Sequence, residues 1–206
     1  MSSDKIQVTF EDGRQSVLPR GISVSGALES EAGSGNGWIA ARVNGKLVDL
    51  ATTLEEDATI EGLTADSGVG LEILRHSASH IMAQAVKGLF PEAKVAIGPA
   101  IENGFYYDFD VDRPFTEEDL ARIEAGIAKI VSQRLAFHRR EMAREEAIKF
   151  FEQRGETYKV ELLRELSEPT VSLYEQGGFV DLCRGPHLPH TGHLKAFKLT
   201  SVAGAY

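Results

Sequence analysis

The stretch LEILRHSASHIMAQAVKGLF, residues 71–90, decides how the sequence divides. Its apolar residues recur at steps of three and four, the spacing of one buried face of an α-helix; they are Leu71, Leu74, Ala78, Ile81, Ala85 and Leu89. Proline cannot continue a helix, so Phe90-Pro91 ends it. Before TADSGVG, residues 64–70, the apolar pattern has the period of strands instead. We therefore predict two domains, 1–64 and 65–206.

Residues 1–64 predict short strands around one helix. Apolar residues alternate over 6–10, and a turn at Glu11-Asp12-Gly13 lets the chain return as a hairpin. A brief helix is expected from Val24 to Leu28 with Ser23 as its N-cap, and a loop at 33–37. Further strands are expected on both sides of Asn44-Gly45 and near 59–61. This pattern indicates a small β-grasp (ubiquitin-like) domain.

Residues 65–206 predict an α+β domain with helices packed on an antiparallel sheet. The segment 96–110 is expected to form hairpin strands, because it has turn signals and then alternating aromatic residues. Thr116 and Asp119 indicate a capping box, which opens a helix with a stripe of Leu120, Ile123, Ile127 and Ile130. Another helix is expected over 144–153. The remainder, to Tyr206, is rich in glycine and proline and predicts strands and loops.

Composition limits the classes of function. The chain has 206 residues, a net charge of -9 and a single cysteine. The negative charge argues against a protein that grips nucleic acid through a broad basic face, so any RNA contact must be local. A lone cysteine forms no intrachain disulfide, and no apolar run is long enough for a membrane span or a signal peptide. We expect a soluble, cytoplasmic protein with no membrane partner.

His76 and His80 are four residues apart on the first helix of the second domain, so their rings lie on one side of it. That side is opposite the apolar stripe and is expected to face away from the main core. Either these are two solvated surface histidines, or they line a cleft between this helix and a neighbouring sheet. A zincin motif needs glutamate directly after the first histidine, and Ser77 stands there, which disfavours a metalloprotease.

A second group of polar residues lies near the end of the chain. Pro186 disfavours a helix here, so Cys183 and His187 lie on an extended or turning segment. Together with the two helical histidines they are a plausible zinc set in ligand type. Asp181 leaves an extended strand on the same face as Cys183. Several other residues have ordinary structural explanations as surface, hairpin or loop side chains: Lys159, Tyr106, Tyr107, His190 and His193.

Five strings resemble, in the same order, the amino-terminal region of threonyl-tRNA synthetases: RHSASHIMAQAV (75–86), AIGPAIENGFYYD (96–108), RGETYKV (154–160), VDLCRGPH (180–187) and FKLTSVAGAY (197–206). Residues 1–64 resemble the TGS domain of the same family. The two histidine-containing strings are also similar to the editing domain of alanyl-tRNA synthetases, which is the main competing family.

The resemblance implies editing, the hydrolysis of mischarged seryl-tRNA(Thr), with no cofactor and the serine-bearing acceptor end of tRNA(Thr) as partner. Family editing residues match here as His76, His80, Tyr107, Lys159, Asp181, Cys183 and His187. It implies that His76 activates water, that Lys159 stabilises the oxyanion or orients the water, and that Asp181 holds the seryl ammonium. The other four shape the pocket and fix the ribose and the serine hydroxyl.

The resemblance further implies that the chain is a fragment. It ends before the class II core, so the aminoacylation site with its zinc and ATP-Mg, and the anticodon-binding domain, are expected to be missing. Full-length members dimerise through that core, so a monomer is expected here. Three alternatives stay open: an alanyl-like site with zinc at His76, His80, Cys183 and His187; nucleophilic attack by Cys183; and a non-catalytic RNA-binding module.

Overall fold

The computed structural model describes residues 4–33 and 35–204, which form two compact units. The first unit extends to Leu74 and includes Gly185–Pro189, and the second holds the rest. The division falls inside helix α2 (Gly68–Leu89). The first turn of α2 lies close to the end of the preceding strand, since a β-carbon on Gly70 would collide with the Thr64 carbonyl. Of the predicted segments, Ser34 in the 33–37 loop and residues 205–206 of the last quoted string lie outside the described residues.

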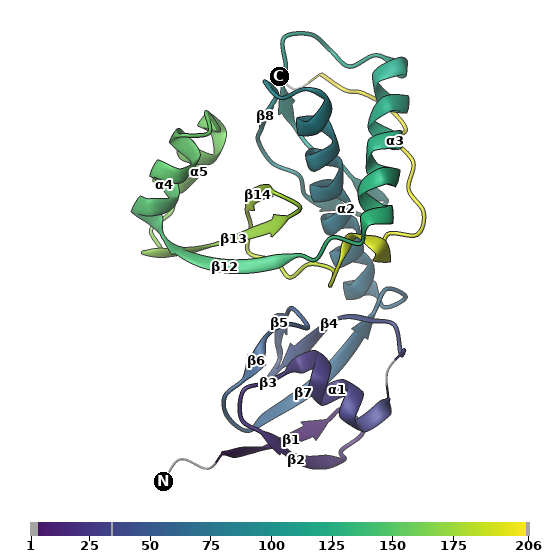
Figure 1. Ribbon diagram of the computed structural model, residues 1–206, viewed down its shortest axis with the longest axis vertical. Helices are drawn as coiled ribbons and strands as arrows, with labels where there is room; N and C mark the ends of the chain where they lie inside the picture. The colour runs from purple at the N-terminus through teal and green to yellow at the C-terminus, as the bar shows by residue number, and fades with distance from the viewer. Residues whose placement is uncertain (1–3, 34, 205–206) are drawn as a thin grey trace. The chain divides into compact units, whose positions relative to one another are not determined.

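The first unit is a five-stranded mixed sheet with one helix (Figure 1). The sheet order is β2-β1-β7-β4-β5, with β1 and β7 parallel and the other neighbours antiparallel. A short ribbon pairs two further strands, β3 and β6. This is the β-grasp fold that the sequence predicts. The strands are β1 (Lys5–Phe10), β2 (Gln15–Pro19), β3 (Ile22–Ser23), β4 (Trp38–Val43), β5 (Lys46–Val48), β6 (Thr53–Leu54) and β7 (Ala58–Thr64).

Helix α1 (Val24–Ala32) begins where the sequence predicts, because the Ser23 hydroxyl accepts a hydrogen bond from the Gly26 amide at 3.0 Å. Asn44 and Gly45 both have positive φ, 49° and 81°, which is the signature of a tight type I′ turn between β4 and β5. The core between helix and sheet is apolar throughout, with Val8, Val24, Ala27, Leu28, Ala41 and Ile60 among its buried members.

The second unit packs helices beside an antiparallel sheet of order β12-β13-β14 (Figure 1). Helices α2 and α3 lie side by side, and a β-carbon on Gly126 would be only 3.2 Å from that of Ala85. The predicted capping box of α3 is present, because Asp119 and Thr116 each bond the other's backbone amide. The elements are α3 (Glu117–Gln133), β12 (His138–Ala143), α4 (Arg144–Glu152), α5 (Thr157–Glu165), β13 (Thr170–Gln176), β14 (Phe179–Leu182) and the 3-10 turn η1 (Thr191–His193).

The predicted hairpin is present between α2 and α3. It is built from two short ladders, β8 (Lys94–Val95) with β11 (Phe109–Asp110) and β9 (Ala100–Ile101) with β10 (Gly104–Phe105). Helix α5 is a correction, because strands and loops were expected after Gly155. Gly155 has a φ of 68° and ends α4, and a new helix begins two residues later.

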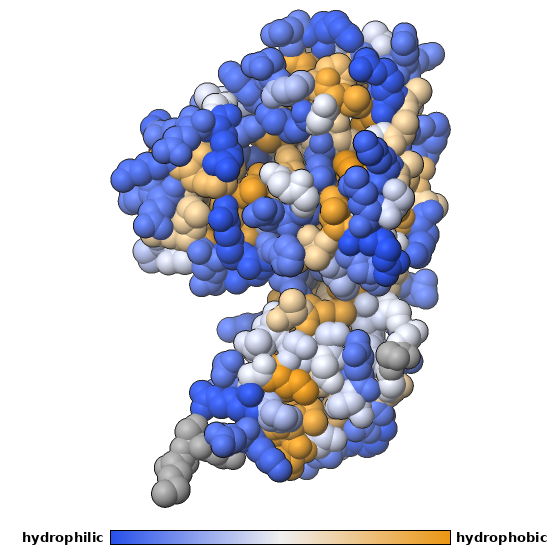
Figure 2. Space-filling model, viewed as in Figure 1, coloured by the Kyte–Doolittle hydropathy of each residue, from blue (hydrophilic) through white to orange (hydrophobic). Residues whose placement is uncertain are grey.

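The remaining features of the fold concern the polarity of its surface and of its helices. Hydrophilic side chains predominate on the face of the second unit that Figure 2 shows. Within the described residues, the helices are each too short or too polar to cross a lipid bilayer.

Candidate active site

Helix α2 carries the two histidines through the interior of the second unit. His80 is only 2% exposed and its neighbours from Ser77 to Ala83 are all buried, whereas Leu71 of the predicted apolar stripe is 36% exposed. The prediction that the histidine side faces away from the core is therefore wrong for His80. The reason is that α2 is covered on more than one side. Gln176 of β13 donates to the His80 carbonyl at 3.2 Å, and α3 packs against α2 at Ala85. His76, one turn earlier, is half-buried.

Strand β14 brings the second group of residues to this helix. The structure places the Cys183 sulfur 3.0 Å from Nε2 of His76, and the nearer Asp181 carboxylate oxygen 3.7 Å from Nε2 of His80. Asp181 and Cys183 both face α2, because alternate residues of an extended strand leave on one side. The two histidine rings are themselves 4.9 Å apart between centroids. Two stretches separated by 107 positions, His76 and Cys183, thus meet at one place.

Lys159 enters from α5, the helix that the sequence did not predict. Its side chain is 3% exposed, and its ammonium lies 2.6 Å from Asp181 Oδ1, 2.6 Å from the Ala96 carbonyl and 3.0 Å from the Tyr107 hydroxyl. An ammonium has three donors, so all of them are used. The buried positive charge is therefore fixed in position beside a buried carboxylate.

Tyr107 comes from the hairpin and completes the buried network. Its hydroxyl donates to Asp181 Oδ2 at 2.5 Å. Burial, followed by the negative charge of Asp181, raises the pKa of Tyr107 well above 10.0, so the hydroxyl keeps its proton. Asp181 also accepts from the Leu182 amide at 2.8 Å, which anchors the carboxylate from its own strand.

Burial sets the protonation of both histidines. It lowers the pKa of His80 well below 6.5, and the neighbouring His76 and Lys159 act in the same direction. Burial also lowers the pKa of His76, although Asp181 and the Gly98 carbonyl oppose the change. Both imidazoles are therefore neutral at pH 7. His76, half-buried beside the half-buried Cys183, is the basic group of this cluster that solvent reaches.

Three other histidines and Tyr106 were also named by the sequence. His187 lies in the segment that belongs to the first unit, where it is buried and its amide donates to Asp49 at 2.9 Å. Tyr106 is 41% exposed. The His190 and His193 rings lie 4.2 Å apart between centroids, tilted by 41°, and His190 Nε2 accepts a hydrogen bond from Arg134 at 2.9 Å. They form a separate pair rather than part of the cluster.

The donor set of the cluster fits zinc by type and spacing. The ligand atoms of His76, His80 and Cys183 lie within 4.8 Å of one another, and His187 is the fourth member of the set by residue type. Neutral imidazole and thiolate are the ligands that zinc prefers. These residues would hold the metal in the zinc alternative raised by the sequence.

Sequence reasoning missed residues that position the others. A β-carbon on Gly98 would lie 2.5 Å from Cε2 of the Tyr107 ring, so this position must lack a side chain for the ring to fit. Ser79 Oγ lies 2.7 Å from the Gly98 carbonyl and ties α2 to the same loop. Phe179 packs edge-on against His80, with 6.5 Å between ring centroids. The Gly98-Pro99 turn was the one available signal, and it indicated only a turn.

Comparison with known families and proteins matches both parts of the chain. Residues 6–64 match the TGS domain, and residues 171–204 match the threonyl and alanyl tRNA synthetase second additional domain. The second match includes Asp181 and Cys183 of the cluster, whereas His76, Tyr107 and Lys159 precede it.

Curated relatives extend the similarity over nearly the whole chain. The chain is 55% identical over 204 residues to a protein named threonine–tRNA ligase from Geobacter sp. (strain M21), 53% over 203 residues to one from Acetivibrio thermocellus and 50% over 209 residues to one from Clostridium tetani. Each alignment covers 98% of this chain but only 32% of the relative, so the chain spans about a third of their length. The chain therefore belongs to the threonyl-tRNA synthetase family and represents the part that carries the TGS and second additional domains.

Proposed function

We propose that the chain hydrolyses the ester bond of mischarged seryl-tRNA(Thr). The observation that carries the proposal is the solvent-accessible pair of His76 and Cys183, 3.0 Å apart, beside a fully buried Lys159–Asp181 ion pair. A neutral base next to a fixed cation is what water attack on an ester carbonyl needs. Membership of the threonyl-tRNA synthetase family supports the choice of ester.

The need for such an activity follows from the two amino acids. Serine lacks one methyl group of threonine, and one methylene is worth only about 1–3 kcal/mol of discrimination in a binding pocket. Serine also fits wherever threonine fits. A second site that admits the smaller ester and excludes the larger one by steric clash removes the error. We assign that second site to the cluster of His76, His80, Tyr107, Lys159, Asp181 and Cys183.

His76 is the proposed base that takes a proton from the attacking water. Its lowered pKa keeps the ring neutral near pH 7, which is the form that accepts a proton. Lys159 stabilises the negative charge that develops on the carbonyl oxygen. Because its three donors are already used, direct donation to that oxygen replaces the bond to the Tyr107 hydroxyl. The pKa of Tyr107 keeps that hydroxyl protonated throughout.

Asp181 is the proposed partner of the seryl ammonium through a charged hydrogen bond. His80, Tyr107 and Cys183 shape the pocket around the amino acid and the ribose, and the resemblance assigns His187 to the same pocket. If zinc were bound, it would polarise the ester carbonyl or lower the pKa of water. Attack by the Cys183 thiol is a less economical route, because an ester of this kind hydrolyses without an acyl-enzyme.

The wider biological setting is part of the proposal. The partner is the serine-bearing acceptor end of tRNA(Thr), and the reaction takes place in the cytoplasm. Residues 65–206 form the editing domain and residues 1–64 the TGS-like domain that precedes it. The full-length protein is a dimer and this chain a monomer.

The test compares two esters on one enzyme. The chain is incubated with seryl-tRNA(Thr) and, separately, with threonyl-tRNA(Thr), at concentrations high enough to offset weak tRNA binding. We expect seryl-tRNA(Thr) to be hydrolysed at least about tenfold faster, in line with 1–3 kcal/mol for one methylene. Equal rates for both esters would defeat the size selection. No hydrolysis of either would favour a non-catalytic RNA-binding module.

A further inference from the structure

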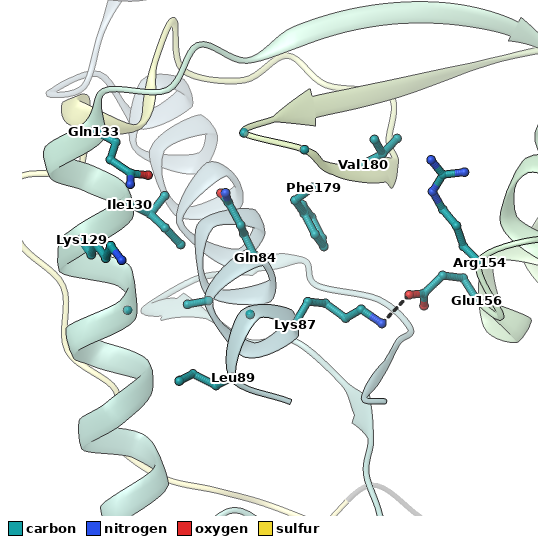
Figure 3. A pocket seen from close by; sticks show the side chains of 15 residues that line it. Gln84, Lys87, Leu89, Lys129, Ile130, Gln133, Arg154, Glu156, Phe179 and Val180 are labelled. Atoms are coloured by element: carbon teal, nitrogen blue, oxygen red, sulfur yellow. Dashed lines mark ion pairs between the residues drawn. The ribbon is translucent and has the colours of Figure 1, made fainter. Parts of the chain in front are cut away.

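A groove of about 630 Å³ crosses the second unit outside the proposed catalytic cluster. Figure 3 shows its construction: α2 forms the floor at Gln84, α3 forms one wall at Lys129, and the start of β14 at Phe179 and Val180 forms the other with Arg154. Gly88 of α2 also lines the groove. The six cluster residues of the second unit do not line it. Its volume is in the range of small-molecule binding sites, roughly 300–1,000 Å³.

The groove carries a net positive charge. Its charged lining residues are Lys87, Lys129, Arg154 and Glu156. Lys87 and Glu156 neutralise each other at 2.8 Å (Figure 3), and Lys87 also donates to the Pro91 and Ala93 carbonyls. The two remaining cations, Lys129 and Arg154, leave a net charge of +2 in the groove of a chain whose net charge is -9.

Both of these cations are available to a ligand. Among the residues that the structure describes, none forms a hydrogen bond or ion pair with the Lys129 ammonium. Arg154 lies 3.6 Å from the centre of the Phe150 ring and donates a long 3.4 Å hydrogen bond to the Phe150 carbonyl. No described carboxylate pairs with it. The two walls of the groove therefore each present one cation without an anionic partner.

The groove also offers groups that suit a nucleobase. The Phe179 ring lines it and is half-buried, which gives a flat apolar face for stacking. The Gln84 side-chain oxygen is buried and accepts no hydrogen bond within the described part of the chain. A buried acceptor without a donor costs free energy, and a base amino group would satisfy it.

We infer that this groove binds a phosphate-bearing nucleotide. Lys129 and Arg154 hold the phosphate, Phe179 stacks on the base, and Gln84 accepts from an exocyclic amine. The nucleotide is either free or part of a single RNA strand, since both present the same chemistry. The inference is independent of the proposed hydrolysis, because the groove and the cluster share no residue.

The first experiment titrates the chain with two probes at low salt, cytidine 5′-monophosphate and a fluorescein-labelled single-stranded tetraribonucleotide. We expect Lys129→Ala and Arg154→Ala each to weaken binding roughly fivefold and to reduce the dependence on salt by about one unit in the logarithmic slope. Arg164→Ala is the matched control, because Arg164 pairs with Glu152 on the surface and does not line the groove. Binding of the tetranucleotide alone identifies a strand as the ligand, and binding of both probes identifies a free nucleotide as sufficient.

A second pair of variants tests the groove itself. A β-carbon at Gly88 meets no atom within 4 Å, so a longer side chain there projects into open space. Gly88→Gln fills the groove, whereas Gly88→Ala leaves most of it open, and both residues favour a helix more than glycine does. We expect Gly88→Gln to weaken binding at least fivefold and Gly88→Ala to leave it nearly unchanged. The inference is overturned if neither probe binds, or if Lys129→Ala, Arg154→Ala and Gly88→Gln all bind like wild type. Nucleotide binding without ester hydrolysis would count against the proposed function and leave this inference standing.

Discussion

Gly98→Ala tests how tightly the hairpin must hold Tyr107. A β-carbon at position 98 would lie 2.5 Å from Cε2 and 2.7 Å from Cγ of the ring, whereas ordinary contact begins at 3.4 Å. The ring must therefore move by about 1 Å, or the loop must move away from it. The Tyr107 hydroxyl bonds Asp181 at 2.5 Å and Lys159 at 3.0 Å, so the same movement loosens both bonds.

The movement has a cost in stability and in rate. Adding one methyl group to a packed interior destabilises a protein by about 1–3 kcal/mol. A misplacement of about 1 Å in catalytic geometry lowers a rate by roughly 100-fold. We expect both effects for Gly98→Ala: a lower midpoint in urea unfolding, and a rate of seryl-tRNA(Thr) hydrolysis about 100-fold below wild type under single-turnover conditions.

Gly104→Ala is the matched control from the same hairpin, because a β-carbon there meets no atom within 4 Å. It is expected to keep at least about half of the wild-type rate, as surface substitutions usually change stability by less than about 0.5 kcal/mol. Wild-type hydrolysis by a folded Gly98→Ala variant would refute the assigned role of the Tyr107 network.

Three further predictions concern the buried charges, the pH profile and the metal. Lys159→Met leaves Asp181 buried without its cation and should lower the free energy of unfolding in urea by about 3–5 kcal/mol. The double variant with Asp181→Asn should recover most of this loss. A Lys159→Met variant within about 1 kcal/mol of wild type would contradict the importance of the buried ion pair for stability. Because burial lowers the pKa of His76 below 6.5, the pH at which hydrolysis falls to half its maximum should lie below 6.5; half-maximal activity above pH 7 would rule out this assignment. Purified chain should contain far less than one equivalent of zinc by elemental analysis, and near-stoichiometric zinc that disappears in Cys183→Ala would favour the alanyl-like site.

Much of the fold could be predicted because local signals agree with it. Asn44-Gly45 fixes a tight turn, Ser23 caps α1, and Thr116 with Asp119 opens α3, and each of these depends on neighbours in the chain. Helix α5 escaped prediction because Gly155 marks a break and the nine-residue helix after it buries only two apolar side chains, Val160 and Leu163, beside Lys159. The burial of α2 escaped for a different reason. A helix that packs on several sides has no single polar face to find, and the small residues Ser77 and Ser79 allow that packing.

Some features of the candidate site could likewise be predicted from local sequence, and others could not. The spacing of His76 and His80 and the alternation of Asp181 and Cys183 are local, so the sequence indicates that each pair shares one side. Tertiary packing brings the histidine pair and the Asp181–Cys183 pair together. The sequence indicated this meeting only through its resemblance to a known family. Lys159 illustrates the limit most clearly, because a lysine in a polar stretch is normally exposed, and this one is buried only through contacts with Ala96, Tyr107 and Asp181.

The most direct measurement of the central claim is the single-turnover rate of seryl-tRNA(Thr) hydrolysis by His76→Ala and by His190→Ala. Both variants remove one histidine of the second unit, but only His76 contacts Cys183, and His190 lies beside Arg134. Loss of a general base should lower the rate by about 10²- to 10⁴-fold in His76→Ala and leave His190→Ala close to wild type. Equal rates for wild type and a folded His76→Ala variant would contradict the assignment of hydrolysis to this cluster.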